Sequence, residues 1–275
     1  MEPLVSVVIT TKNEEKNIEN CLKSIVGQSY KNIEIIVVDN FSTDKTREIA
    51  LKYTDKFFEK GPERSAQRNH GMIEKSNGKY VMFVDADMVL SPNLIKNCVE
   101  YIGRENCAAL HVSEIVMGDG FWSKVRRFER SFYDGTVIDG ARFFQKDKFV
   151  EVGGFDEGMS GPEDWDIDKK LKAIGKIGLV PKNGEEAVIY HNEAEFNLKK
   201  YLSKKGYYTQ SFDKYISKWG KDDNDLKKQF GLSYRYFGVF LEKGKWKRLL
   251  AHPVLTGGMY FLRGSVGAVY LVNRK

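Results

Sequence analysis

The stretch KYVMFVDAD, residues 79–87, joins a short apolar run to two closely spaced carboxylates. Residues 79–84 predict a buried β-strand, because strands covered on both faces are apolar along most of their length. Asp85 stands at the end of this strand, and Asp87 follows two residues later. In open α/β sheets, ligands bind just beyond the carboxyl ends of the strands. The stretch therefore predicts both a sheet and the edge at which a site lies.

The sequence around this stretch alternates predicted strands and helices. Apolar runs at 4–10 and 33–38 predict two more buried strands, and Phe57 marks a short one. Helices are expected over 14–26, from Ser42 or Thr43 to about Tyr53, over 64–76 and over 92–102. Such alternation is typical of an α/β fold with a parallel sheet covered on both faces. The strand ends then bring a set of polar residues to one edge, namely Thr10, Thr11, Asp39, Asp85 and Asp87.

Beyond residue 106 the predicted elements become shorter and less regular. Strands are expected at 107–117, at 140–146 and within 177–190, and helices over 121–132, 163–174 and 194–219. A charged linker at 220–228 precedes the C-terminal segment.

The composition indicates a folded chain with an uneven charge distribution. The 275 residues are 41% hydrophobic and 30% charged, which is enough apolar surface for a sizeable core. The net charge of +6 is uneven, because residues 199–275 carry 17 Lys and Arg against 5 Asp and Glu. A basic C-terminal part of this kind is expected to face an anionic partner. The three cysteines form no CxxC pair, so neither a disulfide framework nor a zinc site is predicted.

Two acidic clusters carry the candidate chemistry. Asp85 and Asp87 would repel each other unless a cation lay nearby, which suggests Mg²⁺ or Mn²⁺. A solvated turn is the alternative interpretation, because Asp is common in turns. The second cluster, EDWD at 163–166, follows a glycine-rich loop and opens a predicted helix. Its carboxylates could supply a general base, or they could serve only as partners of the helix dipole.

Six blocks in a fixed order resemble a known family. They are VSVVITTKNEEKNIENCLKSI, IEIIVVDNFSTDKT, SAQRNHG, GKYVMFVDADM, GGFDE and EDWD. In this order they are similar to inverting glycosyltransferases of family 2, and the resemblance spans roughly residues 3–205. It implies a GT-A fold, a Rossmann-like and mostly parallel α/β sheet, for a catalytic domain over 1–219. Residues 220–275 are then a helical, basic extension.

The resemblance also implies roles for residues that would bind the nucleotide sugar. These are Thr11, Asn13, Glu14, Asp39, Arg68, Asp85, Lys204 and Lys205. Within this set Asp39 matches a contact to the base, Asp85 a contact to the ribose, and Arg68 a contact near the diphosphate. The lysine pair departs from the Arg-Lys-Arg-Tyr run that is commoner in the family. Each position also has a plainer reading, such as a helix cap for Thr11 and Asn13, a turn cap for Asp39 or a surface ion pair for Arg68.

The same resemblance assigns a metal site and a catalytic base. Asp87 matches the principal ligand of Mn²⁺ or Mg²⁺, and His191 sits where relatives help to hold the metal or the diphosphate. A hydrogen-bonded core histidine is the alternative for His191. Asp164 matches the base that takes the proton from an acceptor hydroxyl.

The implied reaction is the transfer of a sugar from a nucleotide-diphosphate sugar to an acceptor hydroxyl. A UDP-sugar is the favoured donor, and a lipid-linked glycan or a polysaccharide is the expected acceptor. The alternatives are a nucleotidyltransferase, whose glycine-rich loop is missing from TTKNEEKN, and a non-catalytic nucleotide-sugar-binding protein. We expect no nucleic-acid partner, because no recognition motif accompanies the basic residues.

The C-terminal segment raises the question of a membrane. Residues 249–272 are moderately apolar, but Arg263 near their middle argues against a span, and KGKWKR at 243–248 precedes them. One interpretation is a segment lying on a membrane surface, and the other is a helix pair packed on the catalytic domain. The first residues do not follow the pattern of a signal peptide. We therefore expect a cytoplasmic protein, peripheral on the inner face of the cell membrane.

Overall fold

The computed structural model describes residues 2–193 and 196–273, with the side chains of 205 and 270–273 outside the description. The chain divides into two compact units. The first unit comprises 1–114, 140–158 and 163–192, and the second comprises 115–139, 159–162 and 193–275. The boundary that we predicted after residue 219 lies within the second unit. The extent of the catalytic domain, 1–219, stays a prediction.

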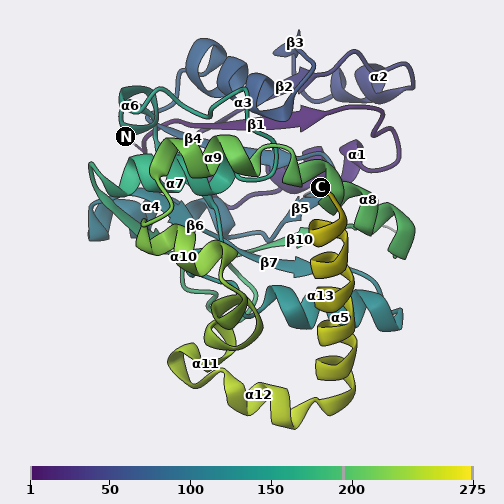
Figure 1. Cartoon of the computed structure of the whole chain (residues 1–275). Helices are drawn as coiled ribbons and strands as arrows, with labels where there is room; N and C mark the ends of the chain where they lie inside the picture. The colour runs from purple at the N-terminus through teal and green to yellow at the C-terminus, as the bar shows by residue number, and fades with distance from the viewer. Residues whose placement is uncertain (1, 194–195, 274–275) are drawn as a thin grey trace. The chain divides into compact units, whose positions relative to one another are not determined.

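A seven-stranded sheet forms the centre of the first unit, in the order β3-β2-β1-β4-β8-β6-β9 (Figure 1). Its strands are β1 (Val5–Thr11), β2 (Ile33–Asp39), β3 (Phe57–Glu59), β4 (Tyr80–Asp85), β6 (Cys107–His111), β8 (Ala141–Gln145) and β9 (Lys176–Leu179). The pairings of β1 with β2 and β4, and of β2 with β3, are parallel. β8 alone runs antiparallel to both of its neighbours, so the sheet is mixed but mostly parallel. A small sheet has the order β5 (Met88–Leu90), β10 (Val188–His191) and β7 (Ser113–Val116).

The strand pattern places a separate core on each face of this sheet. Val5, Val7 and Ile9 of β1 belong to one core, together with buried side chains of α1 (Ile18–Val26) and α4 (Leu94–Glu105). Val8 belongs to the other core, with side chains of η1 (His70–Lys75), α6 (Lys146–Glu151) and α7 (Glu163–Lys172). Successive strand residues point to opposite faces, so one apolar run supplies both cores. The prediction of a sheet covered on both faces is confirmed.

The second unit is mainly helical. Its elements are α5 (Phe121–Arg130), α8 (Leu198–Thr209), α9 (Phe212–Trp219), α10 (Asn224–Phe230), η2 (Tyr234–Gly238), α11 (Val239–Leu241), η3 (Glu242–Gly244), α12 (Trp246–Ala251) and α13 (Pro253–Asn273). α13 packs along α5 and α8 (Figure 1). Within the described residues, no helix combines the length and the apolar character that a membrane crossing needs.

Several predicted elements differ from the observed ones. The strand expected over 107–117 is two strands, because β6 pairs in the large sheet and β7 in the small one. The helix expected from residue 42 begins only at α2 (Thr46–Ala50), since residues 42–44 are hydrogen-bonded to the loop at 13–15. The helix expected over 64–76 is α3 (Arg64–Asn69) continued by the π-helix η1. The charged linker contains the start of α10, because Asp223 caps it by accepting a hydrogen bond from the Leu226 amide at 2.9 Å.

Candidate active site

The strand ends meet as the sequence predicts. In the parallel register Thr11 lies opposite Asp39, and Thr10 lies opposite Asp85. Thr10 Oγ1 donates a hydrogen bond to Asp85 Oδ1 over 3.0 Å. Asp87 follows in the turn between β4 and β5. Three neighbouring strands thus deliver polar side chains to one edge of the sheet.

The loop after β1 is closed against the loop after β2. Asn13 has a positive φ of 54°, its Oδ1 accepts from the Thr43 amide at 2.8 Å, and its own amide donates to Ser42 Oγ at 2.7 Å. Asp39 accepts from the Ser42 amide at 2.7 Å and from its hydroxyl at 2.5 Å. Asp39 therefore caps the turn that follows β2, as the alternative interpretation of this residue predicts. Asn13 does not cap the following helix, because its side chain bonds the second loop instead.

Thr11 and Glu14 are placed differently within the same loop. Thr11 Oγ1 is buried and has no hydrogen-bond partner in the described part of the chain. Glu14 accepts from Asn17 Nδ2 at 2.7 Å. Burial raises the pKa of Glu14, and the nearby carboxylates of Asp87 and Asp85 add to that rise. Buried polar groups are usually hydrogen-bonded, so this hydroxyl at the sheet edge is suited to bonding a polar ligand.

Arg68 links the strand edge to the start of α7. The side chain is almost completely buried, with its guanidinium 3.9 Å from the ring centroid of Phe83. Its Nη2 lies 3.3 Å from Asp85 Oδ1, and its Nη1 lies 3.1 Å from Asp164 Oδ1 and 3.7 Å from Glu163 Oε1. The alternative of a surface ion pair is wrong, because α3 carries this side chain into the interior of the first unit.

A second buried arginine, which the sequence reasoning missed, also faces Asp85. Arg142 on β8 donates from Nε and Nη2 to Glu114 Oε1, over 2.9 and 2.6 Å, and its Nη1 lies 3.7 Å from Asp85 Oδ2. Burial alone would raise the pKa of Asp85, but Arg68 and then Arg142 hold it well below its usual range. The available signal was a charged residue inside each of two predicted apolar strands, at 142 and 114.

Asp87 and His191 come together through the small sheet. Met88 pairs with His191 in the antiparallel register of β5 and β10. His191 Nε2 lies 3.3 Å from Asp87 Oδ2, and its Nδ1 lies 3.7 Å from Glu114 Oε2. Burial works against the charged imidazole, but the bonds to Asp87 and Glu114 raise the pKa of His191 to about 9. Opposite charges therefore alternate from Asp87 through His191, Glu114, Arg142, Asp85 and Arg68 to Asp164.

Asp87 and His191, the residues predicted to hold a metal, supply too few ligands for a complete metal site. Asp87 Oδ1 is buried without a hydrogen-bond partner among the described residues, as a ligand atom would be. Within that same part of the chain, no three His, Cys, Asp or Glu side chains form a group that could hold a metal ion. A metal here would therefore need oxygen ligands from outside the chain, as Mg²⁺ sites that bind substrate phosphates have.

Asp164 is held by the sheet as well as by Arg68. A Cβ added to Gly140 would lie 2.7 Å from Asp164 Cβ, so only glycine allows this approach. One turn later, Asp168 Oδ1 accepts from the Ala141 amide at 3.0 Å, and its Oδ2 lies 2.6 Å from His111 Nε2. The start of β8 thus fixes the face of α7 that carries both carboxylates.

This anchoring leads to a stability prediction. Asp168→Ala should lower the free energy of unfolding by about 3 kcal/mol, because it removes a buried carboxylate that contacts both the Ala141 amide and the His111 ring. Urea unfolding followed by tryptophan fluorescence measures the loss. The exposed Asp55, changed to Ala, is the control. A loss within about 0.5 kcal/mol of that control would show that the contact does not anchor α7.

The predicted lysine pair is not tested by this geometry. Lys204 is an exposed residue of α8 in the second unit. The side chain of Lys205 lies outside the described residues.

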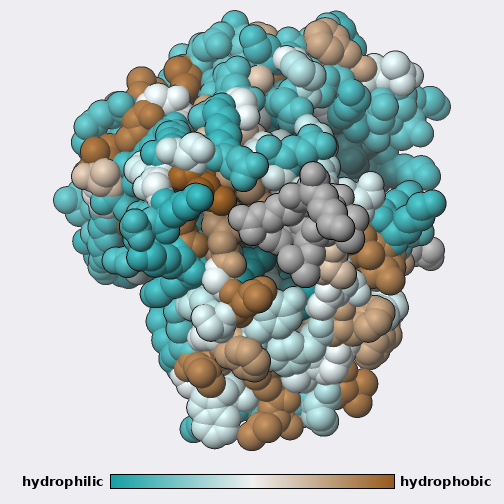
Figure 2. All heavy atoms as spheres, viewed as in Figure 1, coloured by the Kyte–Doolittle hydropathy of each residue, from teal (hydrophilic) through white to brown (hydrophobic). Residues whose placement is uncertain are grey.

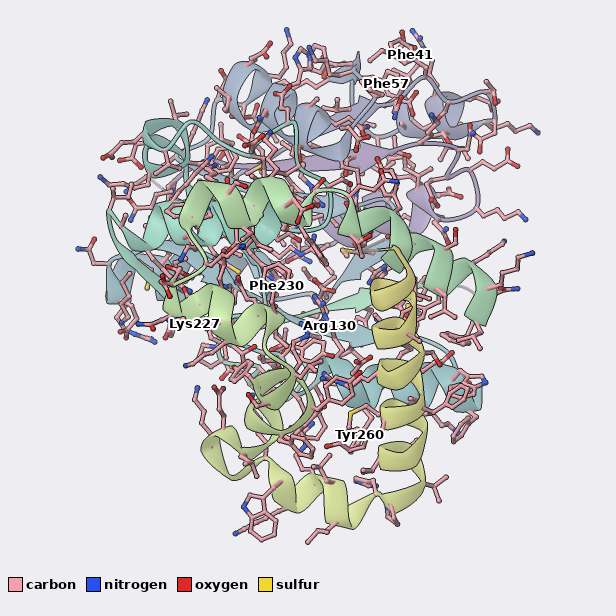
Figure 3. All side chains as sticks on the ribbon, viewed as in Figure 1. Phe41, Phe57, Arg130, Lys227, Phe230 and Tyr260 are labelled. Carbon is pink, nitrogen blue, oxygen red and sulfur yellow. The ribbon has the colours of Figure 1, made fainter. Side chains whose placement is uncertain are left out.

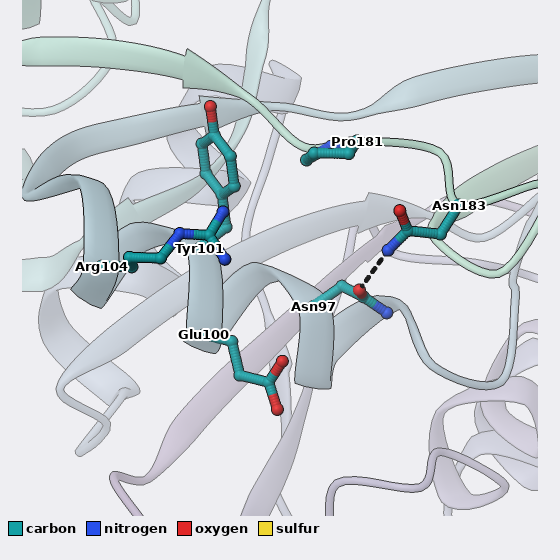
Figure 4. A pocket seen from close by; sticks show the side chains of 6 residues that line it. All are labelled: Asn97, Glu100, Tyr101, Arg104, Pro181 and Asn183. Carbon is teal, nitrogen blue, oxygen red and sulfur yellow. Dashed lines mark hydrogen bonds between the residues drawn. The ribbon is translucent and has the colours of Figure 1, made fainter.

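A hollow of about 170 Å³ in the first unit lies between α4 and the loop that holds Pro181 (Figure 4). None of the predicted site residues lines it.

Comparison with known proteins identifies the family. The family model of Glycosyl transferase family 2 matches residues 6–155, so the chain belongs to this family. An uncharacterized glycosyltransferase of Rickettsia typhi is 29% identical over 194 residues, which are 64% of this chain. The chain spans 60% of the length of that relative. The resemblance drawn from the six blocks is confirmed.

Solved structures show the same fold. The mannosyltransferase PcManGT from Pyrobaculum calidifontis, in complex with GDP-Man and Mn²⁺, matches with a TM-score of 0.65 at 20% identity, over 99% of this chain and 86% of that one. Residues 1–349 of S. aureus TarS, in complex with UDP-GlcNAc, match with a TM-score of 0.58 at 18% identity, over 97% of this chain and 89% of that one. The predicted GT-A fold is confirmed.

Proposed function

We propose that the chain is an inverting glycosyltransferase that moves a sugar from a nucleotide-diphosphate sugar to an acceptor hydroxyl. One observation carries the proposal: the buried Arg68 contacts both Asp85 at the sheet edge and Asp164 at the start of α7. A donor-binding carboxylate and a candidate base are thereby held within the reach of one side chain. The family match favours this function over a nucleotidyltransferase or a non-catalytic binding protein.

In this proposal the nucleotide lies along the edge formed by β1, β2 and β4. Thr11, Asn13, Glu14 and Asp39 hold the base and ribose from the paired loops, and Asp85 contacts the ribose. Arg68 lies near the diphosphate, and Lys204 and Lys205 contact phosphate. Support comes from the meeting of strand ends and from the buried Thr11 hydroxyl without a partner. PcManGT and TarS are each in complex with a nucleotide sugar, with guanosine and uridine bases respectively. A UDP-sugar remains the favoured donor here.

Asp164 is the proposed base. Its Oδ1 is held by Arg68, whereas its Oδ2 accepts no hydrogen bond within the described residues. That oxygen is therefore the one to take the acceptor proton as the hydroxyl attacks. A single displacement needs no protein nucleophile, and it inverts the anomeric centre.

Asp87 and His191 are the proposed holders of Mn²⁺ or Mg²⁺, and His191 would give up its proton on binding the ion, because only the neutral imidazole is a ligand. The buried Asp87 Oδ1 is the observation that favours this role, and the structure of PcManGT contains Mn²⁺. A bound divalent ion would neutralise negative charge on the departing diphosphate. In this proposal the acidic cluster at 163–166 acts on the acceptor, and the cluster at 85–87 binds the donor.

The acceptor is proposed to be a lipid-linked glycan or a polysaccharide, met at the inner face of the cell membrane. The basic balance of residues 199–275, +12, suits an anionic acceptor or surface.

A nucleotide screen tests the proposed function. We expect a nucleoside diphosphate with Mn²⁺ to raise the melting temperature by several degrees, and UDP to act most strongly, because a ligand that binds only the folded state stabilises it. Thermal-shift assays with and without Mn²⁺ measure the effect for UDP, GDP and dTDP, and nucleoside monophosphates serve as controls. No shift with any diphosphate would contradict the proposed donor class.

A further inference from the structure

The second unit exposes a run of large apolar side chains between α10 and α13. Each is at least 43% exposed, although such residues usually pack inside. They are Leu232, Phe237, Leu241, Trp246, Leu250 and Val254. We call this the 232–254 surface, and Figure 2 shows hydrophobic side chains over the same elements, α11 and α12. Exposed apolar side chains gathered on one segment are a feature of sites for a partner or a membrane.

The charges on this segment are predominantly positive. Residues 232–254 contain five Lys and Arg residues and one acidic residue, Glu242. Lys243 and Lys247 are exposed. Glu242 accepts a hydrogen bond from the Tyr234 hydroxyl at 2.9 Å, so this acidic side chain is bonded within the segment. The apolar side chains are therefore accompanied by cations.

The inward-facing side chains of the same segment bond to other residues of the second unit. Lys245 Nζ donates to the Phe132 carbonyl at 2.6 Å, and Arg248 lies over the Phe132 ring, 4.4 Å from its centroid. Tyr260 of α13, labelled in Figure 3, donates to the Tyr236 carbonyl at 2.8 Å. These contacts hold the segment in place from its inward side. The exposed apolar side chains therefore take no part in the packing of the unit.

The buried Arg263 anchors α13 to the rest of the second unit. Its side chain is buried and donates to the Arg235 carbonyl and the Tyr133 hydroxyl, and its Nε lies 3.3 Å from Glu129 Oε1. Gly258 allows α13 to approach α5 closely, because an added Cβ would lie 2.7 Å from Val125. α13 therefore packs on α5, and the side chains of the 232–254 surface stay exposed.

We propose that the 232–254 surface docks on an anionic lipid leaflet. The apolar side chains would enter the boundary between headgroups and acyl chains, and Lys243 and Lys247 would meet anionic headgroups. A second copy of the chain is a poorer occupant, because it would bring two sets of cations together. This inference rests on the membrane side of the proposed function and gives it a defined surface. Its test measures binding and is independent of sugar transfer.

Co-sedimentation of the full chain with vesicles tests the charge contribution. We expect binding to phosphatidylserine-containing vesicles at about 0.1 M salt, and weaker binding at about 1 M, where the Debye length is shorter. Lys243→Gln with Lys247→Gln should weaken binding about 25-fold at the lower salt, since each cation near an anionic surface contributes a factor of about five. Lys52→Gln with Lys96→Gln makes the same charge change in the first unit and should have no such effect.

A second pair of variants tests the apolar contribution. Trp246→Ala with Leu250→Ala should weaken vesicle binding by about tenfold at both salt concentrations, because burial of apolar area does not depend on charge screening. Val26→Ala with Leu51→Ala removes exposed apolar side chains of the first unit as the control.

Three results would overturn the docking role. They are absence of binding to anionic vesicles at low salt, equal binding by all variants, and a dimer in sedimentation velocity that Trp246→Ala with Leu250→Ala dissociates. The last result would assign the surface to a second copy of the chain. Transfer to a soluble acceptor should persist in every docking variant, so loss of docking is distinguishable from failure of the proposed activity.

Discussion

Asp164→Asn is expected to reduce sugar transfer by about 100-fold or more while donor binding persists, because a positioned base contributes about 10²–10⁴-fold. The substitution is nearly isosteric, and the amide oxygen of Asn can still accept the hydrogen bond that Arg68 Nη1 donates to Asp164 Oδ1 over 3.1 Å. The shape of the site is thus retained, and the proton acceptor is removed. Transfer rates at saturating donor, together with donor affinity by calorimetry, separate the two effects.

The neighbouring carboxylates are the matched controls for this prediction. Asp166 is fully buried and pairs with Lys170 at 3.3 Å, so Asp166→Asn should act on stability more than on transfer. Burial and the adjacent Asp164 raise the pKa of Glu163, and Glu163→Gln removes its charge with little change in shape. If Asp164→Asn transfers sugar at the parental rate while Glu163→Gln does not, the base is Glu163.

The strand-end part of the site was predictable from sequence because its determinants are local. A continuous apolar run identifies a buried strand, and the residue after the run must then lie at the sheet edge. Asp39 and Asp85 follow this rule, and the register of β1, β2 and β4 brings them to one edge. The fold class followed from the same alternation of strands and helices.

The electrostatic part was not predictable, because it depends on pairing between distant strands. β8 inserts antiparallel between β4 and β6, and only this order brings Arg142 to Asp85 and Glu114. Nothing near residue 142 in the sequence specifies those neighbours. The burial of Arg68 was likewise not predictable, because the packing of α3 against the sheet is a tertiary property. Arg263 argued correctly against a simple span, but its buried partners on and after α5 were not visible in the sequence.

Asp87→Asn is expected to abolish most of the Mn²⁺-dependent part of donor binding, by about 100-fold in affinity, because a metal contributes several kcal/mol of charge stabilisation to a diphosphate. The buried Asp87 Oδ1, which has no partner within the described residues, is the atom whose charge the substitution removes. Affinities for a nucleoside diphosphate with Mn²⁺ and with excess chelator measure the difference directly.

The comparison of the two conditions makes this prediction specific to the metal. In chelator, the variant and the parent should bind the nucleotide with similar affinity, because the loops after β1 and β2 remain intact. Asp55→Asn makes the same chemical change at an exposed position of the first unit, and it should retain the full gain from Mn²⁺. An equal gain from Mn²⁺ in Asp87→Asn, or full transfer by the parent in excess chelator, would remove the metal from Asp87 and leave the diphosphate charge to Arg68 and the lysines of α8.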